Sequence, residues 1–371
     1  MNKSPELIVM PSGKDRGGAE EALLQYVTYR VTDGLRPHVL ILEEGPLAEA
    51  LAARDATVTK INAGRLREIP RWIRAVQKIV AIARHERPKI ILSWMIKGHL
   101  YGGTAGMITR IPAAYYQMGL PDGSMIDQIC RALPAVGALG CSDFVAREHQ
   151  KKVRYLVRAA ALAADITRFE PARDLSVLKL KQRFGFDPDK PLIGIVGRLQ
   201  RWKGMHVFAE AMAKVINVNP ECQGVIVGGP HDLEPEYAGW LKQRVEELGL
   251  TNKVVLAGAQ QNVPEWMQAM DIFVHASERE PFGIVVVEAM SLGKPVIATK
   301  PGGPEEIIQD KENGLLVPAN DPAALAEAVL SYLSDPGRAA RFGAAARQRA
   351  LRFTPDRFAQ RVTEVLECFS R

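Results

Sequence analysis

The feature that most constrains the fold of this 371-residue chain is the alternation of short apolar runs with longer amphipathic segments. In the first half, the apolar runs that have the length of buried strands are residues 7–10, 38–42, 89–94 and 113–118. Between them, residues 20–31 and 69–84 carry apolar side chains at three- and four-residue spacing, which predicts helices. Strand–helix alternation of this kind predicts parallel sheets covered by helices.

The alternation breaks once, around residues 165–191, where the chain becomes polar and rich in proline. A second series of apolar runs then follows at residues 192–196, 224–227, 254–257, 272–275 and 296–299. Because a typical domain holds about 150 residues, a chain of this length favours two cores. We therefore predict two doubly wound α/β domains, 1–167 and 168–353, and a helix in 354–371. The cleft outside the carboxyl ends of their strands is the expected ligand site.

Composition narrows the class of protein. Hydrophobic residues make up 47% and charged residues 24%, as in ordinary globular proteins, and no apolar window approaches the roughly 18 residues of a spanning helix. The first apolar run is too short for a signal peptide, so a cytoplasmic protein is expected. Four scattered cysteines have no metal-binding spacing. A net charge of +6 favours an anionic partner: a phosphorylated ligand, a membrane surface or nucleic acid.

Residues suited to an anionic ligand follow several predicted strands. Gly17-Gly18 opens a helix, where backbone amides and the helix dipole favour an anion. An ordinary strand–helix turn explains this pair about equally well, and both interpretations stay open. Arg198 and Lys203 follow the run 192–196 and could neutralise a diphosphate, Arg as a fork and Lys as a point charge. Gly302-Gly303 forms another such turn.

The stretch "EPFGIVVVE", residues 280–288, places two glutamates around an aliphatic run. Phe282-Gly283 interrupts the strand pattern, and Gly293 is suited to end a helix, so we predict a buried helix rather than a strand. Glu280 then lies in the loop before this helix and Glu288 about a turn and a half inside it. Carboxylates at these positions suit recognition of hydroxyl groups.

In order and spacing, these motifs resemble those of the GT4 family, which are retaining glycosyltransferases of the GT-B fold. The motifs are Gly17-Gly18-Ala19-Glu20, Gly197-Arg198-Leu199 with Lys203-Gly204, Val227-Gly228-Gly229, Glu280-x7-Glu288, Gly302-Gly303 with Glu306, and Asn313-Gly314-Leu315-Leu316-Val317. The carboxy-terminal half of the match is the more specific. The resemblance implies two Rossmann-like domains facing across a cleft. The acceptor would lie on 1–167 and the nucleotide sugar on 168–353, while 354–371 would return to the first domain.

The resemblance also implies roles for single residues. The donor would be a UDP- or GDP-sugar, with its diphosphate on Arg198 and Lys203, its ribose on Glu288 and its sugar facing Glu280. Gly17-Gly18 would close on the phosphates. The segment that would help to hold sugar and phosphate comprises Phe282, Gly283, Ile284 and Val285.

The reacting centre departs from the family pattern. Many relatives have a histidine where this chain has Gln117, at the end of a predicted strand and on the acceptor or sugar side. His99 is the nearest alternative, and a purely structural helix-start histidine is an equally supported interpretation. The catalytic candidates are therefore Glu280, Arg198, Lys203 and His99. Retaining chemistry in this fold is pictured as front-side attack assisted by the leaving phosphate, so electrostatic stabilisation would carry much of the catalysis.

We expect no metal and no other cofactor. The sequence contains one Asp-x-Asp, Asp187 and Asp189, which in a different glycosyltransferase fold would bind a divalent ion. Here it lies in a proline-containing linker, where a turn explains it better.

The basic segment at residues 64–89 interleaves arginines with apolar residues such as Trp72 and Ile73. It would suit an anionic membrane surface and hence a lipid-linked or cell-envelope glycan acceptor, with the protein peripheral on the inner membrane face. A solvated helix whose apolar stripe packs on its own sheet explains the pattern equally well.

Two other functions share the predicted fold: a nucleotide-sugar 2-epimerase and a non-catalytic sugar-nucleotide binding protein. The ordered Arg198, Lys203, Glu280 and Glu288 set favours the transferase. Nucleic acid is not an expected partner, because aromatic-rich basic motifs are missing from the sequence.

Overall fold

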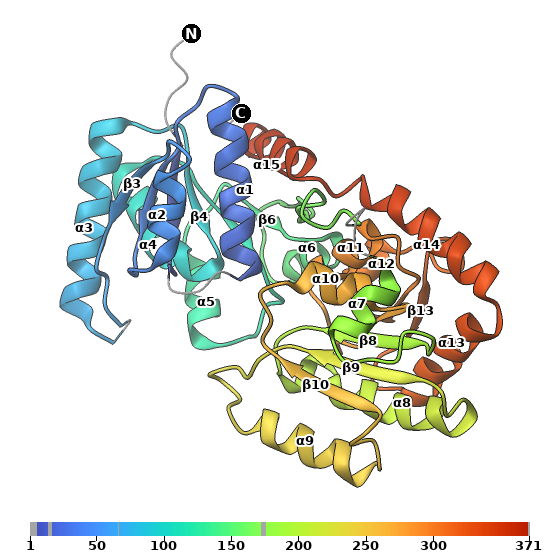
Figure 1. Ribbon diagram of the computed structural model, residues 1–371. Coiled ribbons are helices and arrows are strands. Elements are labelled where there is room, and N and C mark those ends of the chain that lie inside the picture. The colour runs from blue at the N-terminus through green and yellow to red at the C-terminus, as the bar shows by residue number, and fades with distance from the viewer. Residues whose placement is uncertain (1–5, 14–16, 66, 172–175, 370–371) are drawn as a thin grey trace. The chain divides into compact units, whose positions relative to one another are not determined.

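The computed structural model describes residues 6–13, 17–65, 67–171 and 176–369. The chain divides into two compact units, each built around one parallel sheet (Figure 1). The first unit comprises Met1–Ala163 with Pro355–Arg371, and the second is Ala164–Thr354. The division falls a few residues before the boundary predicted at 167.

The first unit contains, within the described residues, a seven-stranded sheet of order β3-β2-β1-β4-β5-β6-β7. Its strands are β1 (Leu7–Met10), β2 (His38–Ile41), β3 (Thr57–Lys60), β4 (Ile91–Trp94), β5 (Ala113–Gln117), β6 (Gly137–Gly140) and β7 (Val157–Ala159). Its helices are α1 (Gly18–Thr32), α2 (Pro46–Ala52), α3 (Ile69–Glu86), α4 (Ile96–Thr109), α5 (Met125–Ala132), α6 (Asp143–Gln150) and α15 (Pro355–Phe369). The strand order reverses between β1 and β4.

Helix α15 is part of the first unit although it is separated from the rest of that unit in sequence by about 190 residues. It packs against α1, as Figure 1 shows. Phe358 stacks on Tyr116 with ring centroids 6.1 Å apart and meets Trp94 edge-on at 6.5 Å. Since all three rings are buried, α15 completes the core on this side of the sheet.

The second unit contains a sheet of order β10-β9-β8-β11-β12-β13. Its strands are β8 (Leu192–Val196), β9 (Gln223–Val227), β10 (Val254–Gly258), β11 (Ile272–His275), β12 (Val296–Lys300) and β13 (Leu315–Pro318). Its helices are α7 (Val177–Arg183), the 3-10 turn η1 (Arg201–Lys203), α8 (Met205–Val218), α9 (Tyr237–Glu247), α10 (Val263–Ala269), α11 (Ile284–Ser291), α12 (Pro304–Ile307), α13 (Pro322–Ser334) and α14 (Pro336–Ala350). The prediction of two doubly wound α/β units is confirmed.

Strand order locates the sites. In a doubly wound sheet, ligands bind outside the carboxyl ends of the strands where the order reverses. In the second unit this point lies between β8 and β11, and in the first unit between β1 and β4.

Candidate functional site

In the second unit, the residues predicted to bind the nucleotide-sugar donor follow β8 and β11, the two strands at its reversal point. Gly197 and Arg198 come directly after β8, and Lys203 ends the turn η1. Glu280 follows β11 and precedes α11. The fold thus brings to one edge of the sheet residues that are about 80 positions apart in the sequence.

Gly204 positions Lys203. Its φ of 72° lies in the left-handed region, and a Cβ there would lie 2.0 Å from the carbonyl oxygen of Ala276. Only glycine therefore lets this turn press against the end of β11. As a result the ammonium group of Lys203 lies 2.7 Å from Glu280 Oε2.

Glu280 is the centre of a buried polar cluster. Its Oε2 also accepts a hydrogen bond from Ser277 Oγ at 2.8 Å and lies 2.9 Å from His275 Nε2. Burial raises the pKa of the Glu280 carboxyl, but the Lys203 ammonium and His275 outweigh this effect and hold its pKa well below its usual range. Glu280 is therefore a carboxylate at neutral pH, and it is fixed in position.

Arg198 remains accessible. Its side chain is exposed, and its guanidinium contacts His231 Nε2 at 3.0 Å. No described carboxylate forms an ion pair with it. Arg198 can therefore offer its fork of N–H groups to an anion at the carboxyl end of β8.

Helix α11 contains the remaining residues predicted to bind the sugar donor. Its presence confirms the prediction of a helix, rather than a strand, after Gly283. Gly283, with φ 105°, precedes its first turn, and the amides of Ile284 and Val285 open the helix. Glu288 is half-buried inside it. The first amides of a helix have no intrahelical partner and attract anions.

The predicted phosphate-friendly turn Gly302-Gly303 has a packing role. A Cβ on Gly303 would lie 2.3 Å from Phe282 Cα, so glycine is needed for contact with the loop before α11. The Gly303 amide donates to the Glu280 carbonyl oxygen at 2.8 Å. This turn supports the shape of the loop that holds Glu280.

In the first unit, Gly17 precedes α1, as predicted, but its amide is already hydrogen-bonded. It donates to Glu20 Oε2 at 3.1 Å, and Glu20 is buried. A phosphate approaching this helix end would have to displace that carboxylate or share the site with it. Gly18 is exposed at the start of the helix.

His99 lies in the first turn of α4 and is completely buried. Its ring packs on Tyr115 at 4.6 Å between centroids, and neither ring nitrogen has a hydrogen bond of normal geometry within the described residues. Burial lowers the pKa of His99 to about 4, against a smaller opposing effect of the Pro134 backbone. A substrate cannot reach this ring, which argues against His99 as a general base.

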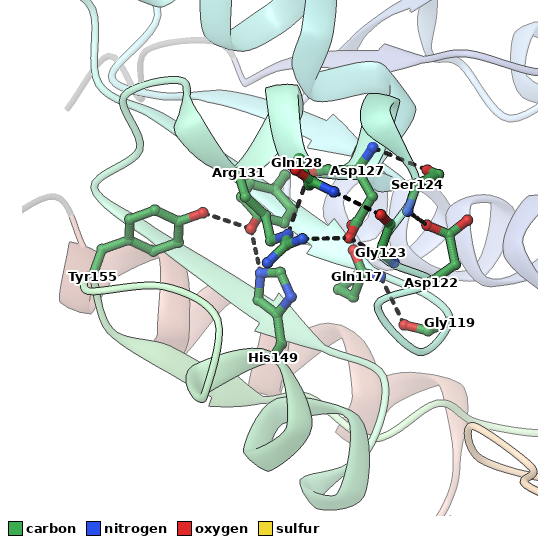
Figure 2. Close-up of polar contacts among 11 residues, drawn as sticks. Gln117, Gly119, Asp122, Gly123, Ser124, Asp127, Gln128, Arg131, His149 and Tyr155 are labelled. Atoms are coloured by element: carbon green, nitrogen blue, oxygen red, sulfur yellow. Dashed lines mark hydrogen bonds and ion pairs between the residues drawn. The ribbon is translucent and has the colours of Figure 1, made fainter.

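Gln117 ends β5 and begins an ordered loop (Figure 2). Its side-chain amide donates to the Gly119 carbonyl at 2.8 Å, while its buried Oε1 has no partner among the described residues. Asp127 accepts the Gly123 amide at 3.3 Å and pairs with Arg131 at 2.8 Å. A side chain of α5 therefore stabilises the loop at the carboxyl end of β5.

A pocket of about 540 Å³ lies at the carboxyl ends of β1, β2 and β3 and borders the reversal point of the first unit. Pro11 after β1 and Lys97 after β4 both line it. Met95, between β4 and α4, has φ 68°, an uncommon conformation that costs about 1–3 kcal/mol. Strain of this kind at a strand end often accompanies a binding site.

Two kinds of feature are absent from the described residues. No three His, Cys, Asp or Glu side chains gather there in a way that could hold a metal ion. None of the described helices combines the length and apolar character needed to span a membrane.

Sequence reasoning missed His275 and Ser277, which hold Glu280 together with Lys203. The available signal was position: both lie at the carboxyl end of an apolar run in the same series as residues 192–196. A polar residue closing a buried strand at that edge is a site candidate.

The fold of the two units is that of the GT-B class. Residues 177–349, most of the second unit, match the family model described as "Glycosyl transferases group 1". The second unit is therefore similar to group 1 glycosyltransferases, and the predicted resemblance to a GT4-like glycosyltransferase is confirmed.

Individual relatives agree with this assignment. The chain is 33% identical over 181 residues to the lipopolysaccharide core biosynthesis mannosyltransferase LpsB of Rhizobium meliloti, covering 47% of this chain and 50% of that protein. It is 33% identical over 206 residues to a D-inositol 3-phosphate glycosyltransferase of Corynebacterium urealyticum, covering 54% and 49%. The chain thus spans about half the length of the curated relatives it matches. HepE of Anabaena, crystallised with UDP and glucose, superposes with a TM-score of 0.86 at 26% identity, covering 98% and 99%.

Proposed function

We propose that this protein is a retaining glycosyltransferase that moves a sugar from a nucleotide-diphosphate sugar to an acceptor hydroxyl. The observation that carries the proposal is the group at the reversal point of the second unit. There Arg198, Lys203 and the amino end of α11 offer positive charge beside the fixed carboxylate of Glu280.

The donor is proposed to be a UDP-sugar, with a GDP-sugar as the alternative. The HepE structures with UDP and with UDP-glucose support uridine, because that protein resembles this chain over nearly its full length. Arg198 and Lys203 would bind the diphosphate, Glu288 the ribose hydroxyls and Glu280 the sugar. The backbone of Phe282, Gly283, Ile284 and Val285 would hold sugar and phosphate.

In the proposed reaction the bond from the anomeric carbon to the diphosphate oxygen breaks, and negative charge develops on the leaving diphosphate. Two cations and helix amides, already in place, stabilise that charge in the transition state. The acceptor oxygen attacks from the same face, and its proton passes to the leaving phosphate. Neither His99 nor a metal is required as a partner in this scheme.

The acceptor is proposed to bind the first unit, near the pocket beside Lys97, and to be a cell-envelope or lipid-linked glycan. The mannosyltransferase LpsB, named for lipopolysaccharide core biosynthesis, supports an envelope glycan. Helix α3 and the turn before it are proposed to touch an anionic membrane surface through Arg67, Arg71 and Arg74. The apolar stripe of α3 gives limited support, since Val76, Ile79 and Val80 are buried in the core. Among the large apolar side chains described in this helix, only Ile69 and Ile73 are strongly exposed.

The test is product analysis with the purified protein and a panel of nucleotide sugars labelled in the sugar. Transfer of the labelled sugar to an added glycan fraction supports the proposal. Slow hydrolysis of the donor that shows the same preference among nucleotides also supports it. Formation of the 2-epimer with free nucleotide would show an epimerase, and binding without any turnover would show a binding protein.

A further inference from the structure

A second, larger pocket of about 720 Å³ opens in the first unit at the opposite edge of its sheet. Ala113, the first residue of β5, and Val136, just before β6, line it, whereas Gln117 at the other end of β5 does not. Arg110 after α4 and Ala132 at the end of α5 form further walls. The pocket is therefore separate from the proposed sugar-transfer site.

All charged side chains that line this pocket are positive. Its lining contains Arg110, Arg131, Lys152 and Arg154 and no aspartate or glutamate. Arg110, Lys152 and Arg154 are exposed, and none of them forms an ion pair within the described part of the chain. Cations near the carboxyl ends of α4, α5 and α6 interact favourably with the negative ends of the helix dipoles. This interaction alone does not explain why the cations converge on one pocket.

The pocket is also flanked by apolar side chains that face solvent. The exposed fractions are 54% for Met107, 47% for Ile108, 40% for Val136 and 43% for Leu156. Met107 and Val136 line the pocket, and Ile108 and Leu156 are close to lining residues in the chain. Large exposed apolar side chains beside unpaired cations are typical of surfaces that meet a bilayer.

We propose that this pocket binds the phosphate headgroup of an anionic phospholipid at a bilayer surface. Arg110, Lys152 and Arg154 pair with the phosphate, and Met107, Ile108 and Val136 enter the acyl boundary beside it. The surface is distinct from α3 and does not depend on sugar transfer. The proposal rests on charge complementarity together with the apolar rim.

Arg131 also stabilises a neighbouring loop, and the test therefore leaves this residue unchanged. It pairs with Asp127, which in turn holds Gly123 in the loop after Gln117 (Figure 2). Tyr155, also in the lining, is hydrogen-bonded through its hydroxyl to Tyr115 at 2.6 Å. Both Arg131 and Tyr155 are left unchanged in the variants, because their loss would disturb the interior.

The test measures co-sedimentation with vesicles of phosphatidylcholine, with and without phosphatidylglycerol, at low salt and without donor. The variant Arg110→Gln, Lys152→Gln, Arg154→Gln is expected to bind the anionic vesicles roughly a hundredfold more weakly than wild type, since each cation near such a surface contributes about one kcal/mol. The matched control is Lys214→Gln, Lys242→Gln, Arg347→Gln, which removes the same charge from exposed positions of the second unit. It is expected to bind like wild type. Met107→Ser with Val136→Ser is expected to weaken binding while leaving its salt dependence intact.

Hydrogen–deuterium exchange locates the contact. Vesicles should slow exchange in residues 106–113 and 131–136 of the wild-type protein. Equal loss of binding in the two Gln triples, or loss on changing α3 but not the pocket, would overturn the proposal. So would binding of soluble glycerol phosphate without vesicle binding, which would indicate a site for a free anion. Because no donor is present, these outcomes are independent of whether the protein transfers sugar.

Discussion

We expect Lys203 to contact two anions at once, the Glu280 carboxylate and the donor diphosphate, and substitutions can test this. Its ammonium lies 2.7 Å from Glu280 Oε2 before any donor is present. If a diphosphate oxygen binds the other side of the ammonium at about 2.8 Å, the carboxylate and the phosphate come to lie about 5 Å apart. At an effective dielectric constant of about 20, their repulsion is about 3 kcal/mol, and Lys203 offsets it.

Two substitutions should therefore act in opposite directions. Lys203→Gln loses a charge-assisted hydrogen bond of about 1.5–3 kcal/mol and also leaves the repulsion unopposed, so UDP should bind about three to four orders of magnitude more weakly. Adding Glu280→Gln removes the repulsion and should restore at least tenfold of that loss. The introduced side-chain amide would keep an oxygen that accepts from Ser277, so the loop should remain in place.

The assay is calorimetric titration of UDP into wild type, both single variants and the double variant, forming a complete cycle. Circular dichroism and melting temperature check that each variant is folded. A double variant that binds UDP no better than Lys203→Gln would refute the idea that Lys203 offsets a repulsion between the two anions.

Four further predictions follow from the same structure. Glu288→Ala should weaken UDP binding by about 1.5–3 kcal/mol, whereas Glu280→Ala should lower turnover more than UDP affinity; equal losses for both variants on UDP and on intact donor would contradict this division. Transfer should survive strong chelation, because Arg198, Lys203 and the α11 amides supply the positive charge; loss of activity that one divalent ion restores would show otherwise. Arg67→Glu, Arg71→Glu and Arg74→Glu together should weaken binding to anionic vesicles and spare donor hydrolysis, and unchanged binding would leave α3 as a solvated helix. His99, whose pKa is lowered to about 4 from an unfolded value near 6.5, contributes stability that is present above pH 6.5 and is lost as pH falls toward 4. His99→Phe should therefore reduce the fall in melting temperature between about pH 6.5 and 4.5, and an unchanged slope would exclude this role.

Periodicity predicted the regular elements best where burial alone determines them. The predicted helix 69–84 corresponds to α3 (Ile69–Glu86), and the predicted strand 192–196 is β8. The strand β3, by contrast, reads Thr-Val-Thr-Lys and is largely exposed at the sheet edge, so it carries no apolar run. The strand β6 is Gly-Ala-Leu-Gly, where Gly140 allows close approach of the Ala146 backbone.

The places of the candidate site residues at strand ends could be predicted, but their contacts could not. Spacing placed Lys203 and Glu280 at strand ends, yet nothing in the sequence indicates that an ammonium and a carboxylate 77 positions apart form an ion pair. The basic residues at 149–158 stand out in the sequence, but their convergence with Arg110 on one pocket was missed for a related reason. Arg110, Lys152 and Arg154 follow two different helices, and only the right-handed crossovers of the sheet bring those ends together.

The position of α15 has a consequence for how the chain folds during synthesis. The second unit is continuous in sequence and leaves the ribosome before α15 does. The first unit, although it is translated earlier, must wait for Phe358 to cover Trp94 and Tyr116. A nascent chain therefore carries an unfinished amino-terminal core, with Trp94 and Tyr116 not yet covered by Phe358, throughout the synthesis of the unit that follows it.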